Sequence, residues 1–236
     1  MMKPAADWFN ALPPGRLLAE FSLWSADLGR LTDEMARVDH YVDVYHIDVA
    51  DGHFSPALLF FPDLAAAARK VTAKPFHVHL MCADDILHDQ IKQFAEAGAD
   101  LISVHAEHRD ADSALALIDH LDLKSGLVLQ LHTPVTAAAG FLDRIRFLTL
   151  LGTRIGIKGQ GLDDTAEQRL RDAKSLIAET KVDHRVVLAA DGGIREHTVP
   201  ALRRAGAETI VMGSLAFNAE KLSDRMTWVR AQSAGA

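Results

Sequence analysis

The sequence has one cysteine, no long apolar run and no excess of positive charge, and each shortage excludes a class of protein. Cys82 is the single cysteine in 236 residues, so the chain forms no internal disulfide and suits a reducing compartment. No apolar run reaches the length of a membrane span, and Met1 to Pro14 lack the charged-then-apolar pattern of a signal peptide. We therefore expect a cytoplasmic protein without a membrane segment.

The charge of the chain argues against nucleic acid as a partner. The formal net charge is −7, and the 25 Lys and Arg residues are scattered without a basic run. The hydrophobic fraction of 49% and the charged fraction of 24% are those of an ordinary globular protein. A chain of this length suits one large domain, and we expect a small-molecule ligand.

Short apolar runs alternate with helical patterns along most of the chain. Strands are predicted near residues 17–25, 43–49, 75–81, 101–105, 126–131, 146–151, 185–190 and 209–212. Helices are predicted near residues 27–38, 63–71, 86–97, 112–121, 164–180 and 216–230, with one starting near 198 and a weaker one after Pro134. Eight such units without a linker predict a single (β/α)₈ TIM barrel over residues 16–236, with an open doubly wound sheet as the alternative. Residues 1–15 lack periodicity and are predicted to be an N-terminal extension.

The stretch Tyr45–Phe54 carries ionisable groups inside an apolar strand. His46 and Asp48 lie two residues apart among β-branched neighbours, so their side chains leave the strand on the same side. A satisfied His–Asp pair in the core is one interpretation. Two buried ionisable groups are costly without partners, however, so further polar residues are expected to converge on them.

The C-terminal ends of the predicted strands collect polar residues, and that end of a barrel carries its function. They are Ser22, Ser25, His46, Asp48, His77, His79, His105, Gln130, His132, Arg154, Asp191, Gly213 and Ser214. His46, Asp48 and Asp191, with a histidine from the third strand, offer a mixed N,O set suited to Zn²⁺, Mn²⁺, Fe²⁺ or Co²⁺. His77 and His79 share one strand face, so spacing leaves open which of them is the ligand.

Five motifs in order along the chain carry a resemblance to a known family. They are Ser22-Leu23-Trp24-Ser25-Ala26-Asp27, His46-Ile47-Asp48-Val49-Ala50-Asp51-Gly52-His53-Phe54, His79-Leu80-Met81, Asp191-Gly192-Gly193-Ile194 and Gly213-Ser214. Together they resemble the D-ribulose 5-phosphate 3-epimerase family, which includes D-allulose 6-phosphate 3-epimerases, from about Leu17 to Phe217. The resemblance implies that His79, which precedes Leu-Met, is the ligand and that His77 packs.

The resemblance implies a metal-dependent epimerase that inverts C3 of a ketose phosphate through an enediolate. Asp48 and Asp191 would exchange the roles of base and acid, and His46, Asp48, His79 and Asp191 would bind the metal. The implied substrate-binding residues are Ser22, Met81, Gly156, Lys158, Gly159, Gln160, Gly192, Gly193, Gly213 and Ser214. The expected partner is a phosphorylated ketose, and we expect a homo-oligomer.

The sequence departs from the family pattern around the expected substrate rather than around the metal. Ala50 and Leu151 replace methionines, and Gln130, His132, Arg154 and Lys158 add polar or basic groups. These changes predict a roomier, more cationic pocket and a different sugar phosphate. Lys158 is predicted to reach the phosphate. Isomerisation, retro-aldol cleavage and non-catalytic binding of a sugar phosphate remain as alternatives.

Overall fold

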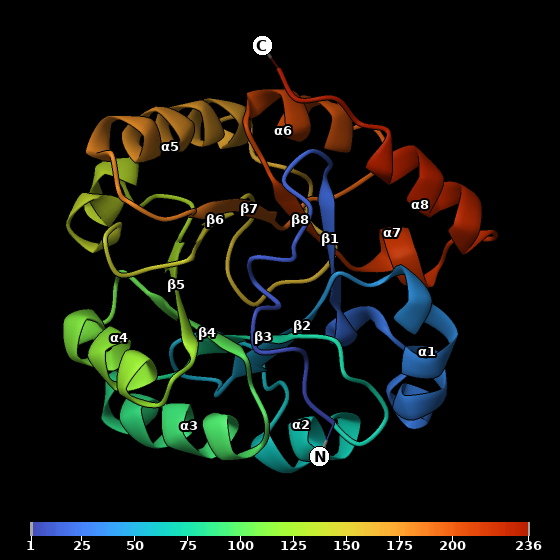
Figure 1. Cartoon of the computed structure of the whole chain (residues 1–236), viewed down its shortest axis with the longest axis horizontal. Helices are drawn as coiled ribbons and strands as arrows, with labels where there is room; N and C mark the ends of the chain where they lie inside the picture. Colours follow the sequence, from blue (N-terminus) through green and yellow to red (C-terminus); the bar gives the residue numbers. More distant parts are fainter. Residues whose placement is uncertain (1, 236) are drawn as a thin grey trace.

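Eight parallel strands close into a barrel in chain order, with the helices arranged around the outside (Figure 1). The computed structural model describes residues 2–235. The strands are β1 (Leu18–Ser22), β2 (Val44–Ala50), β3 (Phe76–Met81), β4 (Leu101–His105), β5 (Lys124–Leu129), β6 (Phe147–Leu151), β7 (Val187–Asp191) and β8 (Thr209–Met212). Because β1 pairs with both β2 and β8, the sheet has no edge. The prediction of a TIM barrel is confirmed, and the open-sheet alternative is wrong.

Each strand leads into helical structure on the outer surface. The α-helices are α1 (Leu31–Val38), α2 (Pro62–Ala68), α3 (Asp84–Glu96), α4 (Ala111–His120), α5 (Ala166–Thr180), α6 (Val199–Ala205), α7 (Ser214–Phe217) and α8 (Leu222–Arg230). The 3₁₀ helices are η1 (Leu23–Ser25), η2 (Leu28–Arg30), η3 (Asp39–Tyr41) and η4 (Val135–Phe141). No helix within residues 2–235 is both long enough and apolar enough to cross a membrane.

Three predicted helices differ from the structure. The helix predicted over residues 27–38 is the 3₁₀ helix η2 followed by α1. The weak helix after Pro134 is the 3₁₀ helix η4, which contains Gly140, a residue that disfavours a continuous α-helix. The helix predicted over residues 216–230 is two helices, α7 and α8. The first ends at Phe217, and it is followed by Asn218, a residue of low helix propensity.

The alternation of side chains on β2 separates its apolar residues from its polar ones. All seven residues of β2 are buried. Tyr45, Ile47 and Val49 belong to the core between barrel and helices, and the Tyr45 hydroxyl donates to the Met35 carbonyl of α1 at 3.1 Å. The intervening side chains of His46 and Asp48 therefore project into the barrel. The register of β3 places His77 beside His46 and His79 beside Asp48, so polar groups form rows across the barrel interior.

The N-terminal extension packs against the end of the barrel opposite these polar rows. Phe9 and Leu12 are buried in a small cluster with residues near the beginnings of the strands, including Val44 and Phe147. Arg185 donates a hydrogen bond of 2.9 Å to the Leu12 carbonyl. The segment thus covers the N-terminal end of the barrel, where it crosses the centre of Figure 1 before entering β1.

Candidate active site

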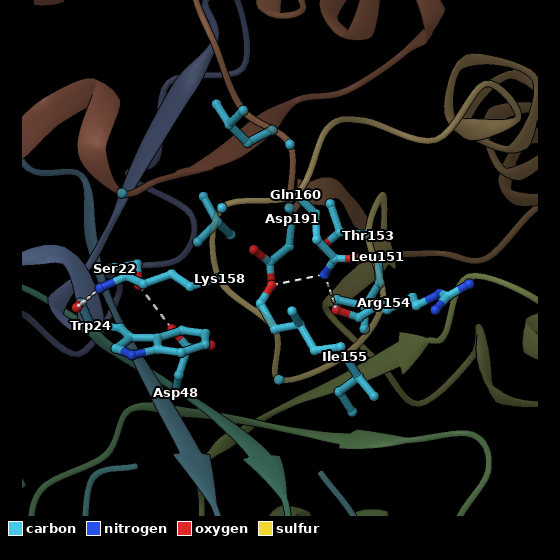
Figure 2. Close-up of a pocket in the computed structure, with 18 of the residues that line it drawn as sticks. Ser22, Trp24, Asp48, Leu151, Thr153, Arg154, Ile155, Lys158, Gln160 and Asp191 are labelled. Carbon is cyan, nitrogen blue, oxygen red and sulfur yellow. Dashed lines mark hydrogen bonds between the residues drawn. The ribbon is translucent and has the colours of Figure 1, made fainter. Parts of the chain in front are cut away.

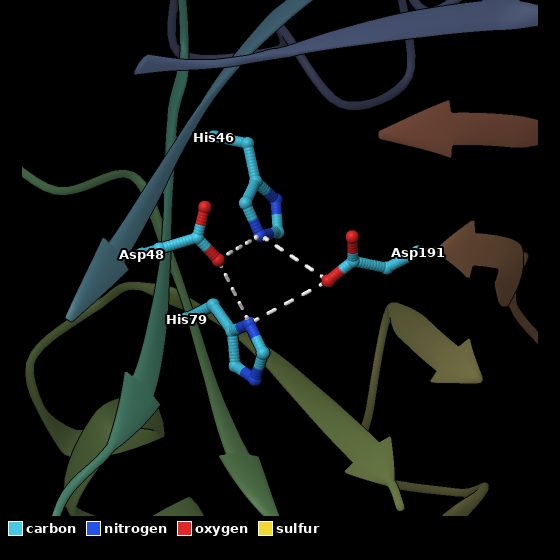
Figure 3. A group of neighbouring side chains, drawn as sticks. All are labelled: His46, Asp48, His79 and Asp191. Carbon is cyan, nitrogen blue, oxygen red and sulfur yellow. Dashed lines mark hydrogen bonds and ion pairs between the residues drawn. The ribbon is translucent and has the colours of Figure 1, made fainter. Parts of the chain in front are cut away.

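Four side chains from three strands converge at the C-terminal end of the barrel (Figure 3). Asp48 Oδ1 lies 3.3 Å from both His46 Nε2 and His79 Nδ1. Asp191 Oδ2 lies 3.9 Å from His46 Nε2 and 3.8 Å from His79 Nδ1. One ligand atom from each residue lies within 4.8 Å of all the others, so a single ion could contact the four.

The chemistry of these residues fits a divalent metal ion. His46 Nε2 is buried and has no hydrogen-bond partner among residues 2–235, which is unusual for a buried ring nitrogen. Two imidazole nitrogens and two carboxylate oxygens form a borderline donor set of the kind that first-row transition ions and zinc prefer. A divalent cation would also offset the cost of burying two carboxylates side by side.

The two aspartates have different electrostatic environments. Burial opposes ionisation of Asp48, but His46 and His79 outweigh it and hold the pKa of Asp48 well below its usual value. The Ser22 hydroxyl also donates to Asp48 Oδ2 at 2.8 Å. Burial raises the pKa of Asp191 to about 6, and the charge of Asp48 adds to this while His46 opposes it. The pair is therefore inequivalent, with Asp48 the stronger acid.

Carboxylates surround His46 on several sides. Burial lowers the tendency of its ring to carry a charge, but Asp48, Glu20 and Asp191 outweigh this, and the pKa of His46 is well above its usual value. Both ring nitrogens of His46 thus face a carboxylate, Nδ1 that of Glu20 and Nε2 that of Asp48. An ion bound at Nε2 would take the place of the proton there.

A cavity of about 320 Å³ opens above the four residues (Figure 2). Asp48, His79 and Asp191 lie in its wall, whereas His46 lies beneath it. All the substrate-binding residues predicted from the sequence line it: Ser22, Met81, Gly156, Lys158, Gly159, Gln160, Gly192, Gly193, Gly213 and Ser214. The cavity wall also includes Trp24, Thr153 and Arg195, for which no role was predicted from the sequence. Only their positions in the sequence, within or next to the motifs and strand ends, could have indicated that they line the cavity.

Two polar residues expected in the pocket lie elsewhere. Gln130 and His132 are not among the residues of the cavity wall. The backbone of Gln130 is engaged on both sides, since its N–H donates to Glu107 Oε1 at 3.0 Å and its carbonyl accepts from Arg169 at 2.9 Å. The expectation that these two residues make the pocket more polar is therefore wrong. Arg154 and Lys158 do line it, as expected.

Lys158 fastens the loop after β6 across the mouth of the cavity. Its Nζ donates to the Trp24 carbonyl at 2.7 Å and lies 5.2 Å from the centre of the Trp24 ring. Within the loop, the Gln160 amide donates to the carbonyls of Arg154 and Ile157 at 2.9 and 2.8 Å. The predicted contact between Lys158 and a phosphate remains a prediction. In this structure the ammonium group binds the backbone of η1, which directly follows β1.

The backbone conformation directly after Asp191 requires glycine at two positions. Gly192 and Gly193 have φ angles of +88° and +69°, which side chains with a Cβ rarely adopt. A Cβ on Gly193 would lie 2.7 Å from the Leu162 Cα, so any side chain at position 193 would clash with the backbone of Leu162. The turn thus brings backbone close to the cavity, as a site for an anion requires.

Buried groups that sequence analysis left without a role lie behind the two histidines. Glu20 Oε2 lies 3.0 Å from His46 Nδ1 and 2.6 Å from His77 Nδ1. Burial disfavours the ionised carboxylate, but His77 and His46 outweigh it and lower the pKa of Glu20 to about 2. On the other side, His79 Nε2 lies 2.9 Å from His105 Nε2. The sequence feature that could have indicated a role for Glu20 is its position as the one carboxylate in the mostly apolar run Leu17–Leu23.

Comparison with known proteins agrees with this geometry. The profile of the Ribulose-phosphate 3 epimerase family matches residues 18–217. The ribulose-phosphate 3-epimerase of Bacillus subtilis is 35% identical over 202 residues, which cover 83% of this chain and 90% of that protein. The ribulose-phosphate 3-epimerase of Escherichia coli is 34% identical over 203 residues, covering 84% and 87%.

A solved structure of 3-hexulose-6-phosphate synthase shares the fold, with a TM-score of 0.64, 19% identity, and coverage of 93% of this chain and 100% of that one. At this identity the likeness concerns the barrel alone. The family profile spans most of the chain, and the B. subtilis and E. coli relatives match along most of their own length. This chain therefore belongs to the ribulose-phosphate 3-epimerase family.

Proposed function

We propose that this protein inverts the configuration at C3 of a ketose phosphate, with Asp48 and Asp191 as the acid and base. The observation that carries the proposal is the placement of these two carboxylates. They enter from β2 and β7, and they point towards each other across the two histidines (Figure 3). Epimerisation requires one group on each face of the carbon, and a simple sugar-phosphate binder has no need of such a pair.

One proton leaves one face of C3, and a different proton is added to the opposite face. One aspartate removes the C3 proton, and the electron pair of the broken C–H bond passes to the neighbouring carbonyl as an enediolate. The other aspartate, protonated beforehand, delivers its proton to the opposite face of C3, which forms the inverted C–H bond. In the reverse reaction the two residues exchange roles. Asp48 is the base in one direction and Asp191 in the other.

His46, Asp48, His79 and Asp191 would hold the divalent ion, for which we propose Zn²⁺, Mn²⁺, Fe²⁺ or Co²⁺. When bound, such an ion supplies positive charge that stabilises the negative oxygens of the reacting substrate. The Ser22 hydroxyl holds one oxygen of Asp48, which fixes the direction of the other. The loop fastened by Lys158 helps to exclude water from the cavity.

The phosphate would bind beside Gly192, Gly193, Gly213 and Ser214, which bring backbone and hydroxyl groups to the cavity wall. Arg154 and Arg195 also line the cavity and add positive charge to it. Because the relatives are named ribulose-phosphate 3-epimerases, a pentulose phosphate is the first substrate to test. A cytoplasmic location and a homo-oligomeric state remain predictions.

A panel of four- to six-carbon ketose phosphates, followed by NMR, tests the function. We expect inversion at C3 for at least one of them, and little reaction of the corresponding free ketose. Formation of an aldose would indicate an isomerase, and a broken carbon chain would indicate a lyase. Either result as the main reaction would overturn the proposal.

A further inference from the structure

A fully buried glutamate lies directly behind the proposed metal centre. Glu20 on β1 is 0% exposed and projects into the barrel beneath His46. One of its oxygens, Oε2, contacts the Nδ1 atoms of both His46 and His77, at 3.0 and 2.6 Å. Its other oxygen, Oε1, has no hydrogen-bond partner among residues 2–235. A buried carboxylate that leaves one oxygen unsatisfied is costly, and packing alone does not explain its presence.

The hydrogen bonds around Glu20 assign the proton positions on the rings. An ionised carboxylate only accepts, so each Nδ1 atom that contacts Oε2 carries a hydrogen. In a neutral imidazole the other nitrogen, Nε2, is then free to accept. His77 Nε2 accepts from the Ser103 hydroxyl at 2.6 Å. His46 Nε2 instead faces Asp48 and Asp191, where the ion would lie.

The second histidine of the centre is arranged by the same logic with the nitrogens reversed. His105 Nδ1 lies 3.1 Å from Glu107 Oε2 and donates to it, so His105 Nε2 is free to accept. His79 Nε2–H donates to that atom across 2.9 Å. This leaves His79 Nδ1 bare and directed at Asp48 and Asp191. Carboxylates outside the ligand set thus select opposite nitrogens on the two ligands.

We propose that Glu20 is a positioning residue of the metal centre, which holds the Nδ1 hydrogen of His46 and so keeps Nε2 as the ligand atom. The inference rests on the proposed metal-dependent function. Glu20 does not itself bind an ion with His46 and His77, although the three lie close together. Their spacings of 2.6 and 3.0 Å are those of hydrogen bonds, and the Nδ1 hydrogens fill the space between them.

Two substitutions at position 20 separate the hydrogen bond from simple packing. Glu20→Met keeps the length of the side chain and removes the acceptor, and we expect Zn²⁺ affinity to fall about 10- to 100-fold. Glu20→Gln keeps a carbonyl oxygen that can accept, so its loss should be smaller. Thr149→Val is the matched control, because Thr149 is also fully buried and its hydroxyl has no partner among residues 2–235. Affinity is measured by competition with a chelator, and Thr149→Val should stay within about twofold of wild type.

Histidine ¹⁵N NMR of the Zn²⁺-loaded protein gives a readout that loss of packing alone would not change. In wild type, His46 should show a protonated Nδ1 and a metal-bound Nε2, and Glu20→Met should lose this single pattern. Wild-type His46 with a bare Nδ1 would overturn the inference, even if no variant at position 20 folds. Glu20→Met with the affinity and spectrum of Thr149→Val would also overturn it, while leaving the metal centre intact. Failure of wild type to bind any of Zn²⁺, Mn²⁺, Fe²⁺ and Co²⁺ would overturn both. Zn²⁺ binding as predicted without epimerase activity would overturn only the proposed function.

Discussion

Replacing Asp191 with asparagine should separate proton removal from inversion. Asp191 lies 3.8–3.9 Å from the two ring nitrogens and its side chain is 17% exposed, whereas Asp48 lies 3.3 Å from both and is 6% exposed. The asparagine retains an oxygen that can contact the ion, so Asp191→Asn should lose less metal than Asp48→Asn. The main effect of Asp191→Asn is then on proton transfer. Inversion should slow by about 10²- to 10⁴-fold, or about 2.7–5.4 kcal/mol in the barrier.

The same variant should still exchange hydrogen on one face of the substrate. Asp48 remains able to remove the C3 proton from one epimer and to return a proton to the same face. In D₂O that epimer should therefore gain deuterium at C3 without inversion, and the other epimer should not. Proton NMR of each epimer, with metal content measured alongside, checks this, and exposed Asp143→Asn serves as the control. Near-normal inversion by metal-loaded Asp191→Asn, or equal loss of exchange from both epimers, would refute the two-base reasoning.

Three further predictions concern the loop, the metal and stability. Lys158→Ala removes the hydrogen bond to the Trp24 carbonyl and a positive charge from the cavity wall. KM for the phosphorylated substrate should therefore rise about tenfold, and the increase should be smaller at high salt. An unchanged KM would exclude both the loop-fastening and the phosphate-binding role of Lys158. Wild type should contain about one divalent ion per chain by metal analysis, and His79→Ala should lose most of it. The variant His120→Ala, at an exposed histidine, should retain the ion. Full retention of the ion by His79→Ala would show that His79 is not a ligand. Asp51 accepts three backbone N–H groups at 2.7–2.9 Å, which lower its pKa although burial opposes this, so Asp51→Asn should cost about 1–2 kcal/mol in urea unfolding at pH 7. Because the folded pKa lies below the unfolded value, this stabilisation is complete above about pH 4 and is lost as the pH falls through the folded pKa; a difference that persists at pH 2 would contradict the assignment.

The barrel and its central residues follow from local patterns in the sequence. The alternation of strands and helices predicted the fold, because each unit must bury an apolar face against its neighbours. The period of two along β2 placed His46 and Asp48 on one side, and the structure has them inside the barrel. These predictions succeeded because they depend on neighbours in the chain.

The features that sequence reasoning missed depend on register and on side-chain direction. Glu20 meets His46 because β1 pairs with β2 with Ser22 opposite His46, and no local pattern fixes that register. The hydrogen bond from Lys158 to the Trp24 carbonyl joins residues far apart in the chain, so no local pattern predicts it. Phe9 and Leu12 have no periodicity and still pack under the barrel, since a short segment needs only a few apolar side chains to dock.

The most direct test of the account follows C3 of the substrate in D₂O. Wild-type protein loaded with a divalent ion is incubated with ribulose 5-phosphate, or with the ketose phosphate that the panel identifies, and the mixture is followed by NMR. The account predicts formation of the C3 epimer with one solvent deuterium at C3 and an intact carbon chain. Deuterium at C1 with formation of an aldose, cleavage of the chain, or inversion without solvent deuterium at C3 would contradict it.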